Sequence, residues 1–424
     1  KRIWQIKKMK IFRLTAVITS AFLISACGLI DESSLNDNSA KLPLFGQDLS
    51  FFSKYGVNAI LLGEGDSLIA VSPQLQGRVL TSTYGGAESP SLGWMNKRLI
   101  TDTNADRQVS DLGGEDRLWL GPQGGDFSIF FPNGSIMNQE NWRIPEAISS
   151  EPWTLVGRNK NQAKLEKVAD IENITGTKFK VRLEREISVL TRQNVGEILG
   201  IEIPDSLEIV AFQSFNKITN LGSEKWNDKT GMLNLSVQSC FNANKTVRVF
   251  VPYRPGEPSK LGDIVRDNYF ESLGTQTSGR LVIAPDYVQL KCDGQNRSGI
   301  GISPRRSEGI ILSYDVANNL LTVVMYIKPS GLRGYLANSW RRNSEMFDGD
   351  AISLYNNGPL ARTSMVAAPF YEISTYSPAL ELAAGKSQFH LQRTFHFHGS
   401  EYDLGLISYK LAGISITQLR GEAE

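Results

Sequence analysis

Short runs of strand-forming residues recur along most of the chain, separated by Gly, Pro, Asn and Asp. Within several of these runs apolar and polar residues alternate, as they do in a strand with one buried face. Turn sequences such as Pro-Asn-Gly at 132–134 and Asn-Asn-Gly at 356–358 lie between them. The runs predicted as strands are 59–62, 68–72, 127–131, 178–189, 207–216, 232–239, 246–253, 280–285, 310–314 and 320–327.

Helical periodicity is scarce after the N-terminal segment, and residues 260–273 are the best candidate for a helix. The chain shows no internal repeat and no long linker. We therefore expect residues 46–424 to form a single all-β domain built from large antiparallel sheets.

The first 26 residues have the organisation of a secretory signal peptide. A positive leader is followed by the apolar stretch 14–24 and by Ser-Ala-Cys at 25–27. The apolar stretch is shorter than the roughly 20 residues that a membrane-spanning helix needs. Residues 24–27 resemble a bacterial lipobox, which implies that Cys27 is lipidated and becomes the mature N-terminus. The alternative is an ordinary signal peptide with an accidental cysteine.

A lipid on Cys27 would anchor the mature protein to a membrane through the polar residues 27–45, which we expect to act as a tether. Gly28 follows the cysteine where an aspartate would retain a lipoprotein in the inner membrane. By resemblance to lipoprotein sorting rules, this favours the outer membrane of the cell envelope. The sequence leaves the leaflet open.

Nothing in the composition points to binding of nucleic acid. Lys and Arg number 45 against 44 Asp and Glu, and no basic block follows the leader. Beyond Cys27 only Cys240 and Cys292 remain, and whether they form a disulfide is left open.

All three histidines lie in one segment, 388–399. If this segment is an unbroken strand, His390, His396 and His398 share one face with Gln392 and Thr394. His396 and His398 are then candidates for a general acid and base. The alternatives are simple hydrogen bonding and, less favoured, metal ligation.

Glu372 is a lone carboxylate within the aromatic segment 369–378. If its face of the strand lines a cleft, burial would raise its pKa and suit it to proton transfer. On a solvent face it is an ordinary surface glutamate. The neighbouring Phe370, Tyr371 and Tyr376 offer rings that stack on the apolar face of a sugar.

Three further segments supply candidate ligand-binding residues. Arg117 and Trp119 share a strand face in the glycine-rich segment 113–131. Arg305 and Arg306 either clamp an anionic group or pair with structural carboxylates. Neutral hydrogen-bonding groups, aromatic rings and one carboxylate cluster between residues 335 and 358, a mixture that suits a ligand rich in hydroxyl groups; they are Asn338, Trp340, Asp350, Tyr355 and Asn356.

These segments, in this order, resemble an uncharacterised family of bacterial envelope lipoproteins. The matching motifs are the run 118–131, Pro-Arg-Arg-Ser at 304–307, Gly-Asp at 349–350, Tyr-Asn-Asn-Gly-Pro at 355–359 and Phe-Tyr-Glu-Ile-Ser at 370–374. That family looks like the galactose mutarotase supersandwich, a large twisted antiparallel β-fold. Family members carry glutamate where this chain has Gln123 and glutamine where it has Asp126, which weakens a catalytic role at that turn.

The resemblance implies a carbohydrate ligand. Mutarotases use a histidine from a central strand and a late glutamate, but the middle of this chain contains no histidine. Glu372 would be the late acid, with His396 or His398 as its complement and His390 and Gln123 beside the ligand. Such chemistry needs no cofactor, because an acid and a base suffice to open and close a hemiacetal.

The sequence leaves three functions open for what we expect to be a monomer. The first is proton transfer on a sugar ring, as in an epimerase or mutarotase. The second is glycan binding without turnover. The third is cleavage of a polysaccharide by a lyase or hydrolase, but a hydrolase needs two opposed carboxylates and Glu372 has no evident mate in the sequence.

Overall fold

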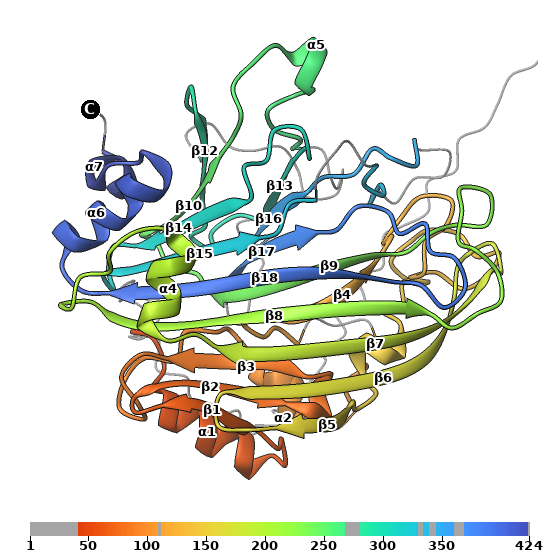
Figure 1. Cartoon of the computed structure of the whole chain (residues 1–424), viewed down its shortest axis with the longest axis horizontal. Helices are drawn as coiled ribbons and strands as arrows, with labels where there is room; N and C mark the ends of the chain where they lie inside the picture. Colours follow the sequence, from red (N-terminus) through yellow and green to blue (C-terminus); the bar gives the residue numbers. More distant parts are fainter. Residues whose placement is uncertain are drawn as a thin grey trace, which may run out of the picture. The chain divides into compact units, whose positions relative to one another are not determined.

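The computed structural model describes residues 41–102, 104–108, 112–267, 280–329, 334–338, 345–359 and 369–422. Residues 39–424 form one compact unit. Three antiparallel sheets dominate it, as Figure 1 shows. The prediction of an all-β chain built from large antiparallel sheets is confirmed.

The largest sheet has ten strands in the order β11-β12-β10-β14-β15-β18-β8-β7-β6-β5. Its middle consists of long strands that alternate buried and exposed residues, as in β7 with every second side chain buried. The strands are β5 (Thr154–Arg158), β6 (Gln162–Glu172), β7 (Lys178–Val189), β8 (Glu208–Asn220), β10 (Val247–Pro252), β11 (Leu281–Ile283), β12 (Tyr287–Lys291), β14 (Ile310–Asp315), β15 (Leu320–Tyr326) and β18 (Ser387–His398).

The second sheet has five strands in the order β13-β16-β17-β9-β4. Its strands are β4 (Arg117–Gly121), β9 (Asn234–Asn242), β13 (Ser298–Ile302), β16 (Ile352–Asn357) and β17 (Phe370–Tyr376). A third sheet joins β1 (Ile60–Glu64), β2 (Ser67–Ser72) and β3 (Arg78–Thr83).

Short helices flank the sheets. Several of them begin with side-chain caps; for example, the hydroxyl of Thr191 accepts from the backbone N–H of Asn194, and that of Ser400 accepts from the backbone N–H of Asp403. The helices are α1 (Phe45–Lys54), α2 (Lys97–Thr101), α3 (Glu146–Ser149), α4 (Arg192–Leu199), α5 (Pro258–Leu261), α6 (Glu401–Ala412) and α7 (Ile416–Arg420), with one 3₁₀ turn at Pro73–Leu75.

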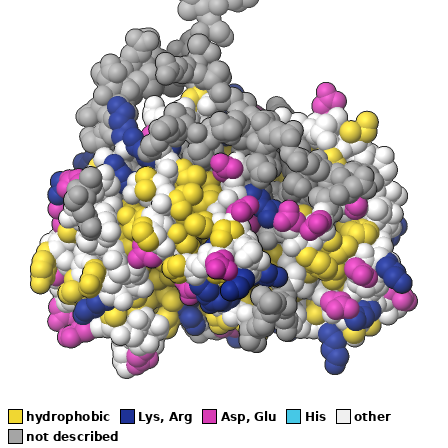
Figure 2. All heavy atoms as spheres, turned by 90° about the horizontal axis from the view of Figure 1, so that it is seen from above, with side chains coloured by type: hydrophobic (Ala, Val, Ile, Leu, Met, Phe, Trp, Pro, Cys, Tyr) yellow, Lys and Arg dark blue, Asp and Glu magenta, His cyan; other side chains and the backbone are white. Residues whose placement is uncertain are grey.

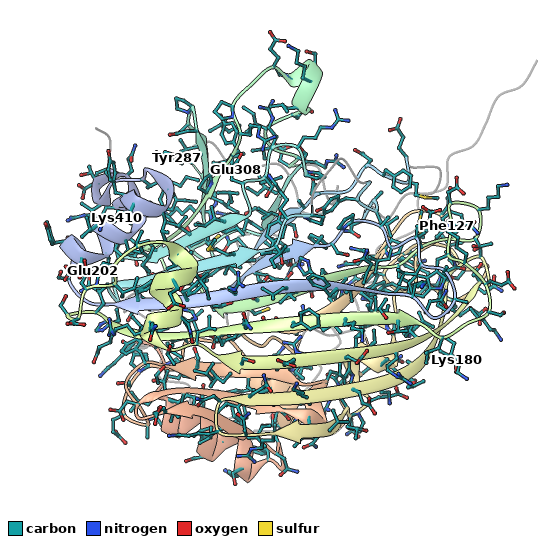
Figure 3. All side chains as sticks on the ribbon, in the orientation of Figure 1. Phe127, Lys180, Glu202, Tyr287, Glu308 and Lys410 are labelled. Carbon is teal, nitrogen blue, oxygen red and sulfur yellow. The ribbon has the colours of Figure 1, made fainter. Side chains whose placement is uncertain are left out.

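Hydrophobic side chains cover both faces of the ten-stranded sheet. On one face Phe395 and Phe397 of β18 pack in a cluster with residues of α4, α6 and α7. Figure 1 shows α4 crossing β8 and β18, and Figure 3 labels Glu202 and Lys410 at the same end of the sheet. The opposite face packs against the five-stranded sheet.

Hydrogen bonds between the two sheets identify the inner face of each. Thr375 of β17 bonds to His390 of β18 at 2.8 Å, and Gln392 of β18 donates to Ser239 of β9 at 2.9 Å. Because side chains alternate along a strand, the neighbours of Thr375 and Ser239 point the other way. We call that side of the five-stranded sheet its outer face.

Most predicted strands are confirmed within a few residues, and 178–189 is confirmed at both ends. The strand predicted at 127–131 is wrong, because this glycine-flanked segment forms turns and bends. The helix predicted at 260–273 is wrong for residues 262–267, because the short helix α5 already ends at Leu261. Residues 268–273 lie outside the described residues.

Basic, acidic and hydrophobic side chains lie side by side on the face drawn in Figure 2, in keeping with the balanced charge of the chain. Within the described part of the chain, no helix is both long and apolar enough to cross a membrane.

A candidate ligand-binding face on the five-stranded sheet

The outer face of the five-stranded sheet brings together polar and aromatic side chains from four strands. Strand register places Arg117 beside Gln238, Gln238 beside Ser374, and Ser374 beside Ser353. Residues directly opposite each other in antiparallel strands point to the same face. We call this set the outer-face cluster, and its members are Arg117, Trp119, Ser236, Gln238, Cys240, Ser353, Tyr355, Glu372, Ser374 and Tyr376.

An ion pair lies at the centre of the outer-face cluster. Arg117 Nη2 lies 3.0 Å from Glu372 Oε2, and the Ser374 hydroxyl donates to Glu372 Oε1 at 2.7 Å. The side chains of Arg117 and Glu372 keep 6% and 12% of their surface exposed. The carboxylate is therefore held by donors, desolvated on most sides and still reachable from solvent.

Beside this ion pair, three polar atoms are buried and have no hydrogen-bond partner within the described residues. They are the indole Nε1 of Trp119, the Oγ of Ser236 and the Oε1 of Gln238. Buried polar groups are nearly always paired, and an unpaired one costs about 1–3 kcal/mol. One donor, one acceptor and one hydroxyl left open on neighbouring strands are what a bound polyhydroxyl ligand could satisfy.

Aromatic rings border the other side of Glu372. Trp94 stacks on Phe370 with ring centroids 4.0 Å apart, and Tyr355 lies 6.1 Å from Phe370. On the far side, the guanidinium of Arg117 lies over the Trp119 ring at 4.6 Å from its centroid. Rings beside hydrogen-bonding groups match the two sides of a sugar, with C–H groups on one and hydroxyls on the other.

Tyr376 completes the cluster at the end of β17. Its phenol bonds to the Ser353 hydroxyl at 2.9 Å. Burial raises the pKa of Tyr376 to about 12, the Ser353 hydrogen bond opposes this rise, and the nearby Glu372 charge adds to it. The phenol is neutral at physiological pH and acts as a hydrogen-bonding group.

Three consecutive charged residues fix the start of β4. Glu115 accepts from the Ser82 hydroxyl at 2.6 Å and bonds to His396 at 2.8 Å. Asp116 forms a fully buried ion pair with Arg185 of β7. Arg117 then reaches Glu372 on the outer face, so its guanidinium is positioned by contacts that the two preceding residues make inside the fold.

Close backbone approach explains the two glycines before this triplet. Gly113 has φ +79°, and a Cβ there would lie 2.5 Å from Trp94 Cε3. Gly114 has φ +113°, and a Cβ there would lie 2.5 Å from Arg78 Cδ. Only glycine fits these positions without displacing its neighbours.

The predicted acid–base pair of Glu372 with a histidine is not assembled. His390 and His396 lie on β18 between the sheets, whereas Glu372 points to the outer face of β17. His396 is fully buried between Glu115 and Thr322. The prediction that the histidines share a face was correct, but it did not identify this face as the buried one.

The remaining histidine properties also favour structural roles. Burial lowers the pKa of His390 to about 3, so its imidazole is neutral. His398 bonds to Glu208 at 2.7 Å and stacks on Tyr84. Among the described residues, no three His, Cys, Asp or Glu side chains are grouped as metal ligands.

The paired arginines do not lie on the outer face. Arg306 is fully buried, and its guanidinium donates to the backbone carbonyls of Arg254, Gly256 and Gly262. Arg305 donates to the carbonyl of Lys260 at 2.9 Å. Of the two alternatives for this pair, the anion clamp does not apply to Arg306, whose guanidinium is occupied by backbone carbonyls before and after α5.

Of the other predicted ligand-binding residues, only Asp350 lies near the outer-face cluster, and the others that the structure describes make contacts elsewhere. Asp350 lies 3.6 Å from Arg266 and close enough to Tyr376 to influence its pKa. Asn356 is structural, because it accepts from Gly294 and donates to Asn296. The backbone of Gln123 donates to the side chain of Asn338 at 3.3 Å. Trp340 and Cys27 lie outside the described residues.

Sequence reasoning missed Ser236, Gln238 and Cys240, which form the outer-face row of β9. They alternate with Val237 and Ser239, so the period of two was visible. Nothing in the sequence showed that this row lies beside Glu372. The cysteines themselves are both free and buried, so no disulfide joins Cys240 to Cys292.

Residues 43–422 match the model of a family described only as a family of unknown function, DUF6786. The chain belongs to the DUF6786 family. The match confirms the expected membership of a family that has no assigned function. The lipoprotein character of this DUF6786 protein stays a prediction. No curated protein sequence matches it.

Solved structures similar to this DUF6786 protein include a candidate aldose 1-epimerase of Escherichia coli K12, with 11% identity over 81% of this chain and 100% of that one and a TM-score of 0.48. A candidate mutarotase of Salmonella typhimurium shares 14% identity over 81% and 91%, with a TM-score of 0.45. A galactose mutarotase-like protein of Lactobacillus casei shares 10% over 80% and 100%, with a TM-score of 0.45. At this level of similarity no residue role passes to the present chain.

Proposed function

We propose that the outer-face cluster binds a carbohydrate without converting it. The observation that carries this proposal is the group of buried, unpartnered polar atoms on Trp119, Ser236 and Gln238 next to the Arg117–Glu372 ion pair. A buried polar group that has no protein partner needs a hydrogen bond from a bound ligand or an ordered water. Hydroxyl groups both donate and accept, so one sugar can satisfy a donor and an acceptor together.

Binding is favoured over proton transfer because the predicted partner of Glu372, a histidine, is not on its face. The groups found at its carboxylate include Arg117, Ser374 and Cys240. The histidines lie behind the sheet, and the pKa of Tyr376 is raised to about 12. A general acid works best with a pKa near the operating pH. An epimerase-like reaction would need a general acid on this face with a pKa nearer to neutrality than that of Tyr376.

The second part of the proposal concerns location. The lipobox-like residues 24–27 support a lipid on Cys27 that anchors the protein in the cell envelope, with the sugar-binding domain carried on the tether 27–45. Replacing Cys27 by serine is expected to release the protein from the membrane fraction. Membrane attachment that survives Cys27→Ser would contradict the anchor.

The sugar-binding proposal is tested with a panel of monosaccharides and oligosaccharides and isothermal titration calorimetry. Trp119→Phe keeps an aromatic ring, although a smaller one, and removes the N–H donor, so we expect at least fivefold weaker binding, equivalent to about 1 kcal/mol. Trp226→Phe is the matched control, since Trp226 packs against Phe179 in the core.

Two results would contradict sugar binding without turnover. The first is that no sugar binds, or that Trp119→Phe binds as the wild type does. The second is interconversion of sugar anomers by the wild type, followed by NMR, that is lost in Glu372→Gln. That result would make the protein a mutarotase with an acid not yet identified.

A further inference from the structure

The ten-stranded sheet ends in an edge that is only partly covered. Its last strand, β5, pairs with β6 from Arg158 opposite Ala163 to Thr154 opposite Glu166. Strand β6 continues to Glu172 and pairs with β7 along its whole length. Residues 167–172 therefore have a strand neighbour on one side only.

The backbone of this free edge retains hydrogen-bonding capacity. In an antiparallel strand, every second residue directs its N–H and C=O to the same side. Across the described chain, no backbone hydrogen bond from outside the sheet reaches residues 167–172. The exposed edge is about 20 Å long at 3.4 Å per residue and is a template for another extended chain.

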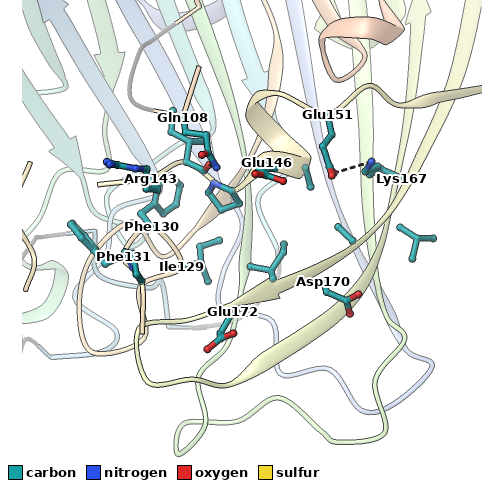
Figure 4. Close-up of a pocket in the computed structure, with 17 residues that line it drawn as sticks. Gln108, Ile129, Phe130, Phe131, Arg143, Glu146, Glu151, Lys167, Asp170 and Glu172 are labelled. Atoms are coloured by element: carbon teal, nitrogen blue, oxygen red, sulfur yellow. Dashed lines mark hydrogen bonds and ion pairs between the residues drawn. The ribbon is translucent and has the colours of Figure 1, made fainter. Parts of the chain in front are cut away.

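A pocket of about 490 Å³ lies along this edge, drawn in Figure 4. All six residues from 167 to 172 line it, although consecutive strand residues point to opposite faces. A pocket that touches both faces of one strand must meet that strand at its edge. Its opposite wall is the segment 143–147 with the start of α3, and Phe130 and Phe131 lie at one end.

The charges in the pocket select the incoming chain. Within the described residues, no ion pair or hydrogen bond holds the carboxylates of Glu146, Asp170 and Glu172, whereas Glu151 is paired with Lys167 at 2.9 Å. Arg143 donates to the carbonyls of Glu140 and Trp142, on its own loop. The pocket therefore presents an excess of negative charge.

Strand β7, which pairs with the other side of β6, carries basic residues opposite the acidic side chains of the free edge. On β7, Lys178 and Lys180 lie directly opposite Glu172 and Asp170. An acidic row on β6 is thus bordered by a basic row on one side and by the free edge on the other. Opposite charges on adjacent strands stabilise pairing, so a second basic row fits the free side.

We propose that the free edge of β6 binds an extended peptide in which basic residues alternate with apolar ones. The peptide adds as a strand next to residues 167–172. Its basic side chains lie on the face of Asp170 and Glu172, and its apolar side chains lie on the face of Ala169 and Ile171. This site is separate from the outer-face cluster and does not depend on sugar binding.

The test uses a fluorescent peptide of three Lys-Val repeats, the full-length chain and fluorescence anisotropy. We expect saturable binding that weakens at least tenfold when alternate backbone amides of the peptide are N-methylated. A Glu-Val peptide of the same length should bind at least tenfold more weakly than the Lys-Val peptide. N-methylation leaves the charge intact, so it separates strand addition from simple charge attraction.

Protein variants supply the second arm. Asp170 and Glu172 are exposed, so Asp170→Lys with Glu172→Lys should fold and lose at least tenfold in affinity. The matched control is Glu202→Lys with Asp205→Lys, also exposed; Figure 3 places Glu202 at the opposite end of the sheet from Lys180. This control should bind as the wild type does.

Three outcomes would overturn the proposal. The first is that the Lys-Val peptide does not bind, and the second is that N-methylation leaves its binding unchanged. The third is that the protein forms a dimer in place of the peptide complex, and that this dimer is lost in the Asp170→Lys, Glu172→Lys variant. The last outcome would assign the edge to a second copy of the chain.

Discussion

Asp116 and Arg117 are adjacent in the chain but form ion pairs on opposite sides of the five-stranded sheet. Asp116 binds Arg185 in the fully buried space between the sheets, and Arg117 binds Glu372 on the outer face. The alternation of side chains at the start of β4 therefore couples an internal ion pair to the candidate ligand-binding face. A change at Asp116 should disturb Arg117 without touching the ligand.

Removing the buried partner should be costly. Asp116→Ala leaves the Arg185 guanidinium charged and unpaired in the interior, and we expect the free energy of unfolding to fall by about 3–5 kcal/mol. Urea unfolding followed by circular dichroism measures the loss. The control Glu381→Gln breaks the exposed pair with Lys225 and should cost less than about 1 kcal/mol. Equal losses in the two variants would show that the Asp116–Arg185 pair carries no special weight.

The buried imidazole of His390 predicts a loss of stability in acid. Its pKa is lowered from 6.5 to about 3, so between these values the unfolded chain binds a proton that the folded chain does not. The free energy of unfolding should therefore fall by about 1.4 kcal/mol for each unit by which the pH is lowered within that window. Denaturation series at several pH values measure the slope, and His390→Gln should reduce it. A His390 NMR signal that titrates near pH 6.5 would contradict the prediction.

The phenol of Tyr376 predicts a loss of stability in base, so the free energy of unfolding changes with pH in the opposite direction. Its pKa is raised from 10.0 to about 12, so between these values the folded chain keeps a proton that the unfolded chain releases. The free energy of unfolding should therefore fall as the pH rises from 10 to 12. Phenolate absorbance gives the test, because Tyr376→Phe should remove a component that titrates late, while the exposed Tyr402 serves as control. Burial also raises the pKa of Tyr84 and Tyr314 to about 12, so the late component should shrink by one tyrosine and not vanish. A late component of unchanged size in Tyr376→Phe would contradict the prediction.

Both cysteines of the domain should resist thiol reagents. Cys240 and Cys292 are buried, and burial raises the pKa of Cys292, which keeps its thiol protonated. In a Cys27→Ser chain, we expect no reaction with an aromatic disulfide reagent until denaturant is added, and then reaction of both thiols. Absence of free thiols after unfolding would mean that the cysteines had been oxidised.

Alternation along single strands was enough to predict several features of the candidate face. It placed Arg117 and Trp119 on one side of a strand, set Glu372 within an aromatic strand, and grouped the histidines of β18. Alternation separates the two faces of a strand, however, and does not show which of the two faces is covered by another sheet. The polar face of β18 is the buried one, because Thr375, Ser239 and Glu115 supply its hydrogen bonds from distant parts of the chain.

Pairing between distant strands was equally invisible in the sequence. The side chains that share the outer face with Glu372 come from β4, β9 and β16, and only strand register makes them neighbours. Arg306 shows the same limit, because two adjacent arginines suggest an anion site, whereas backbone carbonyls of a loop occupy the guanidinium. Local pattern predicts the type of element, and long-range contacts decide what each polar group does.

The order β13-β16-β17-β9-β4 has a consequence for synthesis on the ribosome. Strand β4 ends at Gly121, but its partner β9 begins only at Asn234, roughly a hundred residues later. At ordinary translation rates that interval lasts on the order of ten seconds, and Glu372 emerges later still. Arg185, the partner of Asp116, is synthesised before β9, so the nascent chain can form this ion pair early, whereas the five-stranded sheet can close only after β17 with Glu372 has been made.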